Sequence, residues 1–383
     1  TEGSPVESYT LEISPAPPSG VAQKTGVTGN TARWDGLQNG TEYQVRVRAH
    51  NRAPEPSDFS QWSAGEIPAA PPAAPGAPTV ARLEPVGDRA QMRVAWNPPA
   101  DNGDPIDNYE LNVIRGGSVV QVIEVAAGQT SQAVVVDTSQ SDYTYSVRAI
   151  NKAGWGETSP QSAPRRAFTP PGAPTGVTAR EGDNQVVVQW EPGASNGANA
   201  NEIQYQYNVG NGWRGDWAAG GGSGTQGTIG NGQVNNGGTY SVRIRAVATA
   251  DGTTYEGAAS AASNPVRPYG QIGNPTARAT RTGDGRTITM EWSSPAPNGR
   301  PVTTEIRTGD GRGWRQVAAS GTERYDLPYS TTRTLEVRTK AEGSQTTTAQ
   351  DSATTVDEPP PPQPRVWVTQ GGAAGSCVNG CRY

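Results

Sequence analysis

Four segments of the chain alternate apolar and polar residues, and they recur at a near-constant spacing. They begin at residues 41, 141, 237 and 332 and read TEYQVRVRAHN, SDYTYSVRAIN, GGTYSVRIRAVA and TRTLEVRTKA. Alternation with period two is typical of a β-strand that buries one face. Such a long repeat indicates a tandem array of similar units. The chain is therefore predicted to be all-β, with immunoglobulin-like β-sandwiches arranged like beads on a string.

A second recurring strand precedes three of these segments and ends in tryptophan. It reads QMRVAWNPP (91–99), QVVVQWEPG (185–193) and TITMEWSSP (287–295). Because apolar residues share a face with each indole, Trp96, Trp190 and Trp292 are predicted to lie in three separate cores. Proline-rich stretches separate the units at 67–78, 169–174 and 264–275. Proline cannot join the interior of a sheet, so these stretches are predicted to be stiff joints.

The composition excludes several classes of protein. Glycine (48 residues) and proline (33) are abundant but follow no Gly-X-Y period, which excludes collagen. The chain has no window of 18 apolar residues, so this segment is not expected to insert into a membrane. The net charge is −5 and no basic stripe occurs, which argues against a nucleic-acid partner.

Two stretches carry a family resemblance. WNPPADNGDPIDNYEL (96–111) and YTYSVRAINKAGWGETS (143–159) resemble fibronectin type III domains. The resemblance implies units at 75–169 and 172–268 and a divergent unit at 272–357. It also implies that Tyr43, Tyr143 and Tyr240 are core residues that form a tyrosine corner, a hydrogen bond from the phenol to the backbone just upstream. Arg333 replaces this tyrosine in the divergent unit, which is therefore expected to be the least stable.

The segments are most similar to the bacterial, actinobacterial-type version of this module, which occurs in cell-envelope and secreted proteins. SPVESYTLEIS (4–14) aligns with DPIDNYELNVI (104–114), so 1–70 is predicted to be a partial unit without its strands A and B. Residues 358–364 are predicted to be a polyproline linker, and 365–383 the start of a further Ig-like β module. Either the chain is part of a longer protein, or one copy completes the next in a head-to-tail fibre, in which case the chain is its own partner.

Cys377 and Cys381 are the only cysteines and flank Val-Asn-Gly, a sequence suited to a tight turn. A small disulfide is favoured over a metal site, because a metal needs two more ligands and the only histidine, His50, is far away in sequence. A disulfide predicts an extracellular or cell-surface location.

The segment GNGWRGDWAAGG (210–221) contains Arg214-Gly215-Asp216, a tripeptide that some fibronectin modules use for adhesion. Alternation predicts a strand with Trp213, Gly215 and Trp217 on one face and the two charged residues on the other. The adhesive use needs a long mobile loop. We therefore favour an edge strand whose charges oppose pairing with other strands, and keep Arg214 and Asp216 as candidate binding residues.

Four tryptophans are candidates for stacking on sugar rings: Trp155, Trp213, Trp217 and Trp314. The competing interpretation is that they pack against their own sheets. Neither a catalytic constellation nor a cofactor motif is present, so the chain is predicted not to be an enzyme and to need no cofactor or metal.

The sequence favours a structural function, namely a semi-rigid extracellular stalk or filament that spaces, displays or links other parts. One alternative is an adhesion module that binds a cell-wall glycan or a surface protein. Another is an accessory region of a secreted polysaccharide-degrading enzyme. These functions follow from resemblance of fold and not from a site.

Overall fold

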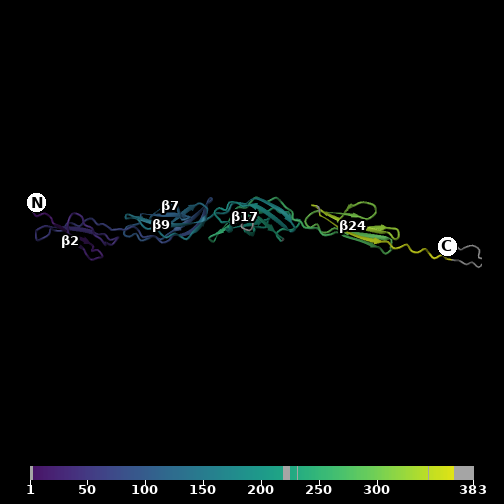
Figure 1. The fold of residues 1–383 in the computed structure, drawn as a ribbon, viewed down its shortest axis with the longest axis horizontal. Helices are drawn as coiled ribbons and strands as arrows, with labels where there is room; N and C mark the ends of the chain where they lie inside the picture. Colours follow the sequence, from purple (N-terminus) through teal and green to yellow (C-terminus); the bar gives the residue numbers. More distant parts are fainter. Residues whose placement is uncertain (1–2, 219–224, 231, 344, 366–383) are drawn as a thin grey trace, which may run out of the picture. The chain divides into compact units, whose positions relative to one another are not determined.

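A computed structural model describes residues 3–218, 225–230, 232–343 and 345–365. Within these ranges the chain folds into seven antiparallel sheets and one three-residue helical turn, Ala200–Glu202 (Figure 1). The described residues thus form a nearly all-β tandem array of β-sandwiches, as the period-two pattern predicted. None of the helices in the described ranges is long and apolar enough to cross a membrane.

The first region contributes one three-stranded sheet among the described residues 3–70. Its strands are β1 (Ser8–Ser14), β2 (Gln23–Val27) and β3 (Gln44–His50), in the order β2-β1-β3. Leu11 lies opposite Val47 in the β1–β3 ladder. The apolar face of this sheet is partly open, since Val47 is 37% exposed. The assignment of this region as a partial fibronectin-type unit stays a prediction.

The second region contains two sheets. Its strands are β4 (Thr79–Val86), β5 (Arg89–Ala95), β6 (Asn108–Arg115), β7 (Ser118–Ala126), β8 (Ser131–Val136), β9 (Ser139–Asn151), β10 (Gly154–Trp155) and β11 (Arg165–Ala167). One sheet has the order β4-β5-β8; the other has the order β10-β9-β6-β7, with β11 also paired to β9. Side chains from both sheets share one buried cluster, in which the ring of Trp96 meets Tyr109 edge-on at 5.3 Å.

The third region repeats the two strand orders. Its strands are β12 (Thr175–Gly182), β13 (Gln185–Glu191), β14 (Ile203–Asn208), β15 (Arg214–Ala218), β16 (Gln226–Ile229), β17 (Arg243–Ala250) and β18 (Thr253–Glu256). The sheets run β12-β13-β16 and β15-β14-β17-β18. Trp190 ends the apolar run of β13 and is 2% exposed.

The fourth region follows the same plan with one change. Its strands are β19 (Thr276–Arg281), β20 (Thr287–Ser293), β21 (Val302–Arg307), β22 (Arg315–Val317), β23 (Ser320–Asp326), β24 (Thr332–Ala341) and β25 (Thr346–Thr354). The sheets run β19-β20-β23 and β22-β21-β24-β25. The last strand, β25, pairs with β24 along its whole length, from Thr332 opposite Thr354 to Lys340 opposite Thr346. Trp292 lies in the core cluster and its Nε1 donates to the carbonyl of Ala318 at 3.1 Å.

In the first three regions, serines that are three residues apart follow the long central strand. In the second region Ser159 donates its N–H to the carbonyl of Val147, and its Oγ accepts the N–H of the same residue at 3.0 Å. Six other serines do the same: Ser57, Ser60, Ser63, Ser162, Ser260 and Ser263. One serine thereby satisfies both backbone groups of one strand residue. We call this arrangement the serine ladder.

The three tyrosines that the resemblance singled out bind the backbone upstream of them. The phenol oxygen of Tyr143 donates to the carbonyl of Asp137 at 3.0 Å. Those of Tyr43 and Tyr240 accept the N–H groups of Gln38 and Asn235 at 3.1 and 3.0 Å. At the matching position of the fourth region, the guanidinium of Arg333 lies 5.2 Å from the ring of Tyr325.

Candidate binding surfaces

The outer faces of the larger sheets carry the same pair of side chains in all four regions. An arginine on the central strand lies directly opposite a glutamate or glutamine on its neighbour. The pairs are Arg46 with Glu12, Arg148 with Glu110, Arg245 with Gln206 and Arg338 with Glu305. Such directly opposed cross-strand pairs contribute roughly 0.2–1 kcal/mol each.

The pair in the second region shows the geometry most clearly. Arg148 donates from Nε and Nη2 to the two carboxylate oxygens of Glu110, at 2.8 and 3.0 Å. This is the fork-like arrangement that holds a guanidinium plane in one orientation. In the third region Arg245 donates once to Gln206, from Nε to Oε1 at 2.9 Å, and makes the fork-like pair of bonds with Glu256, from Nη1 and Nη2 at 2.7 and 2.8 Å.

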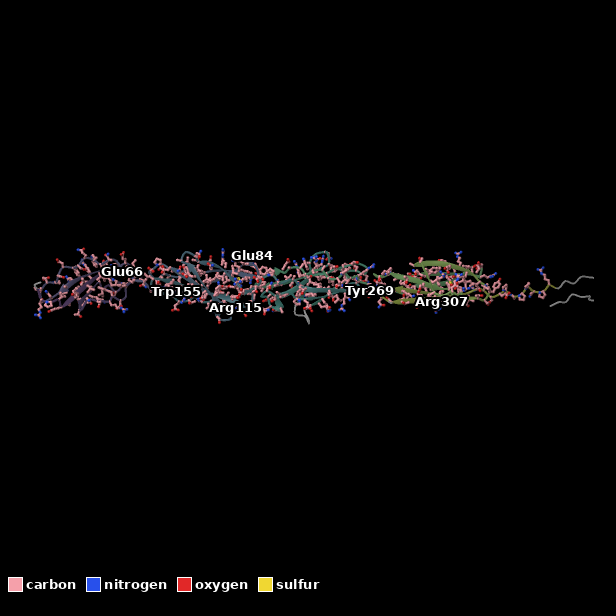
Figure 2. The ribbon with its side chains drawn as sticks, turned by 90° about the horizontal axis from the view of Figure 1, so that it is seen from above. Glu66, Glu84, Arg115, Trp155, Tyr269 and Arg307 are labelled. Atoms are coloured by element: carbon pink, nitrogen blue, oxygen red, sulfur yellow. The ribbon has the colours of Figure 1, made fainter. Side chains whose placement is uncertain are left out.

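An aromatic ring covers each of these arginines. The guanidinium carbon lies 4.6 Å from the ring of Trp62 for Arg46, 4.6 Å from Trp155 for Arg148, 4.6 Å from Trp213 for Arg245 and 4.2 Å from Trp314 for Arg338. Between ring and partner, these arginine side chains are only 14–33% exposed. We call each set of arginine, opposed partner and ring an arginine stack; Figure 2 labels Trp155, the ring of the stack in the second region.

Three of the candidate sugar-binding residues belong to arginine stacks. A guanidinium lies against the rings of Trp155, Trp213 and Trp314, so part of each aromatic surface is already in contact with the protein. Trp155 is 39% exposed, whereas Trp213 and Trp314 are half-buried. The rings come from different elements, since Trp155 lies on β10 while Trp213 and Trp314 precede β15 and β22. Their convergence on one strand position indicates packing of each sheet's own surface.

Trp217 lies on the other face of its strand, which differs from the expected alternation. Its ring stacks on Trp190 at 5.5 Å and on Tyr207 at 4.8 Å, while Trp213 lies against Arg245. The cause is a bulge in β15: Tyr205 pairs with Trp217, but Tyr207 pairs with Arg214. The extra residue reverses the alternation, so the prediction that Trp213 and Trp217 share a face was wrong.

The Arg-Gly-Asp tripeptide lies in this bulge. Gly215 has φ +80°, and a Cβ there would lie 2.7 Å from the ring of Tyr207. β15 is an edge strand of its sheet, as predicted, and Arg214 is exposed. The side chain of Asp216 lies outside the part of the chain that the structure describes. The connection between β17 and β18 does not contain the tripeptide either, because it is a tight hairpin at Asp251 and Gly252.

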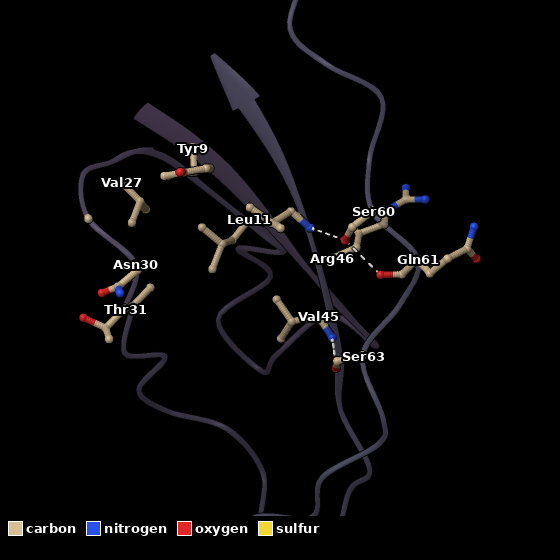
Figure 3. A pocket seen from close by; sticks show the side chains of 13 residues that line it. Tyr9, Leu11, Val27, Asn30, Thr31, Val45, Arg46, Ser60, Gln61 and Ser63 are labelled. Carbon is tan, nitrogen blue, oxygen red and sulfur yellow. Dashed lines mark hydrogen bonds between the residues drawn. The ribbon is translucent and has the colours of Figure 1, made fainter. Parts of the chain in front are cut away.

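A cavity lies on the open apolar face of the first region. It has a volume of about 490 Å³ and is bordered by Tyr9, Leu11, Val27 and Val45 (Figure 3). The serine side chains at its rim are already engaged, because Ser60 and Ser63 accept the N–H groups of Val47 and Val45. The cavity therefore offers apolar contact, and the side chains of Asn30, Thr31 and Gln61 are further polar groups at its border.

Several acidic side chains among the described residues form contacts within the fold. Hydrogen bonds from Arg338 and Lys340 hold the pKa of Glu305 below its ordinary value, and Arg307 does the same for Glu336. The N–H of Lys152 lowers the pKa of Asp104. Nowhere in the described ranges do three His, Cys, Asp or Glu side chains gather as a metal site would require. Cys377 and Cys381 lie outside the described residues.

Two kinds of contact were missed by the sequence analysis. The serine ladder has a visible signal, because Ser-x-x-Ser recurs at 57–63, 159–162 and 260–263. Only the arginines of the arginine stacks can be found in the sequence, because they recur at outward-facing positions of the central strand. Their aromatic partners follow no common spacing and could not be predicted. His50, also on that strand, has Nε2 2.8 Å from the hydroxyl of Thr10.

The chain is thus a tandem β-sandwich array, and comparisons with known proteins identify its best-matched unit. Residues 76–165 match the family model for the fibronectin type III domain, which confirms the resemblance for that stretch. The chain is 26% identical over 181 residues to receptor-type tyrosine-protein phosphatase F of Bos taurus, a match that covers 44% of this chain and 9% of the relative.

Two further relatives match a shorter stretch of the chain. Contactin-5 of Mus musculus is 32% identical over 127 residues, covering 31% of this chain and 12% of that protein. Neural cell adhesion molecule L1 of Homo sapiens is 31% identical over 127 residues, covering 31% and 10%. The chain therefore spans only about a tenth of the length of these curated relatives. They are animal proteins and give no support to the bacterial, cell-envelope assignment.

Among solved structures, the FN1–FN3 domains of chicken CNTN1 match with a TM-score of 0.28 and 15% identity. The match covers 74% of this chain and 99% of the other.

Proposed function

We propose that this chain is a non-catalytic structural segment of an extracellular or cell-surface protein, in which β-sandwiches in series space or link other parts. The observation that carries the proposal is the arginine stack. In each region an aromatic ring covers an arginine that is paired with the neighbouring strand, and three of these rings, those of Trp155, Trp213 and Trp314, were candidates for sugar binding. The conspicuous aromatic residues are therefore used to close the surface of each unit.

A spacer must resist extension as a set of separate folded units. We expect single-molecule stretching of the full chain to give successive unfolding events, one for each complete sandwich. A unit such as 75–169 has 95 residues, which fully extended span about 310–340 Å. Each event should therefore lengthen the chain by somewhat less than this, after subtraction of the folded length. A chain that extends without discrete events would contradict a load-bearing role.

The second candidate function is a protein-binding adhesion module, which is favoured by the names of the relatives and by the exposed Arg214 on edge strand β15. Cells would be plated on the immobilised full chain and on its Asp216→Glu variant, which keeps the charge but lengthens the side chain. Adhesion that is lost in the variant would favour this function over a spacer. Equal adhesion to both, at the level of an uncoated surface, is the result we expect.

A further inference from the structure

The same Asn-Gly turn follows each core tryptophan. The asparagine stands six positions and the glycine seven positions after Trp96, Trp190 and Trp292, which gives Asn102-Gly103, Asn196-Gly197 and Asn298-Gly299. The asparagines have φ values of 54°, 48° and 46°, and the glycines 97°, 91° and 96°. Both residues of each turn are therefore left-handed, a conformation that asparagine tolerates and glycine adopts freely.

Each glycine touches the backbone of the preceding unit too closely for any side chain. A Cβ on Gly197 would lie 2.3 Å from the carbonyl oxygen of Ala167 and 2.9 Å from the nitrogen of Ser139. On Gly103 it would lie 2.4 Å from the nitrogen of Gly40, and on Gly299 2.6 Å from the carbonyl oxygen of Pro268. The three equivalent positions thus exclude a side chain for the same reason, because the backbone of the preceding unit fills the space.

Each asparagine binds two successive residues of the joint. Its carbonyl accepts an N–H, and its side-chain Nδ2 donates to the carbonyl of the next residue along. The three sets are Asn102 with Ala70 (3.1 Å) and Pro71 (2.7 Å), Asn196 with Thr169 (3.0 Å) and Pro170 (2.7 Å), and Asn298 with Gly270 (3.0 Å) and Gln271 (2.8 Å). Every partner atom belongs to the backbone, so the turn does not need a particular side chain opposite it.

The joint between the second and third regions has further contacts. Phe168 is fully buried, with the guanidinium of Arg82 4.4 Å from its ring and Tyr255 edge-on at 5.1 Å. Arg166 pairs with Glu202 at 2.8 Å, and its N–H donates to Asp251 at 2.7 Å. This joint therefore has a small core of its own.

We propose that the Asn-Gly turn is a docking element by which each sandwich binds the end of the preceding unit of the same chain. The residues of the proline-rich joints at 70–71, 169–170 and 270–271 are then held by it and are not free linkers. The inference deepens the proposed structural function, on which it rests, because docked units transmit force and orientation across the joint.

The test is amide hydrogen exchange of the full chain, read at the joint residues. In Gly197→Ala the added methyl group must displace the backbone of Ala167, so the amides of Thr169 and Gly172 should exchange at least about tenfold faster than in the natural chain. Gly29→Ala is the matched control: Gly29 has φ +90°, against 91° for Gly197, but nothing lies within 4 Å of its Cβ position. It imposes a similar backbone cost without a clash.

A milder variant separates loss of docking from loss of folding. Asn196→Asp keeps the shape of the side chain but removes the Nδ2 donor, and should raise exchange at Thr169 while the core amides of Tyr145 and Val147 stay protected. The proposal is overturned if Thr169 keeps its protection in both variants, or if Gly29→Ala exposes it equally. It is also overturned if Thr169 exchanges in the natural chain as fast as an unfolded peptide. Any of these results would leave the discrete unfolding events of the sandwiches intact, so the proposed function could survive it.

Discussion

Trp213 stands just before β15 and Trp217 within it, four residues further on, and replacing each by alanine should have very different costs. Trp217→Ala removes two ring contacts, with Trp190 at 5.5 Å and Tyr207 at 4.8 Å. Each aromatic pair contributes roughly 0.5–1.5 kcal/mol beyond burial of area, so two pairs give about 1–3 kcal/mol before the cavity is counted. Trp213→Ala removes one partly exposed contact with Arg245, which contributes about 0.5–1 kcal/mol.

The measurement must report on this region alone, because unfolding of a multidomain chain is not two-state. Amide exchange of β14 and β17 in the full chain gives a local free energy of opening for each variant. Trp217→Phe, which keeps an aromatic face, is the control and should lie between the natural chain and Trp217→Ala. If Trp213→Ala proved as costly as Trp217→Ala, the bulge would not separate their faces and strict alternation would be restored.

Three further predictions follow from single contacts. Tyr143→Phe deletes the tyrosine-corner hydrogen bond and should cost the second unit about 1 kcal/mol, measured by amide exchange of β9; an unchanged value would remove the corner's role. Ser159→Ala leaves the buried N–H of Val147 without its side-chain acceptor and should cost about 1–3 kcal/mol, whereas Ser159→Thr, which keeps the hydroxyl, should cost less; equal costs would contradict the ladder. The folded-state pKa of Glu305 is depressed, so its stabilising effect should be full above its ordinary value of 4.5 and fade as the pH falls below it. Thermal melts of the fourth unit, followed by NMR, should show that its stability falls as the pH falls in this range, and that it falls less steeply in Glu305→Gln. The same pH dependence in the variant would refute this role of Glu305.

The sequence predicted the all-β class and the repeat because both depend on local alternation and on tryptophans in fixed places. It also placed Arg214 on an edge strand correctly. It could not predict the bulge in β15, because only a tertiary contact, the ring of Tyr207 against Gly215, distinguishes that glycine from many others with the same neighbours. The arginine stacks could not be predicted for a related reason. Trp155 and Trp314 cover equivalent arginines, but they come from elements at opposite edges of their respective sheets.

The Asn-Gly pairs can be read from the sequence, but the contacts that they make could not be predicted from it. In the sequence they belong to a loop between two strands, and their partners lie in the preceding unit, across a proline-rich stretch. The unit boundaries and the relation of Arg333 to stability stay predictions. Loss of amide protection first in the fourth unit on warming would support the second of these.

The serine ladder has a consequence for how such a chain reaches its native state. Neighbouring units of similar sequence meet one another at high local concentration while they fold, and exchange of strands between them is a characteristic failure of repeat proteins. Hydroxyl groups that cap every second N–H of the central strand, as Ser159 and Ser162 do, leave an intruding strand no continuous row of donors to pair with. The spacing of a few serines would in this way protect each of the first three regions from strand exchange with its neighbours.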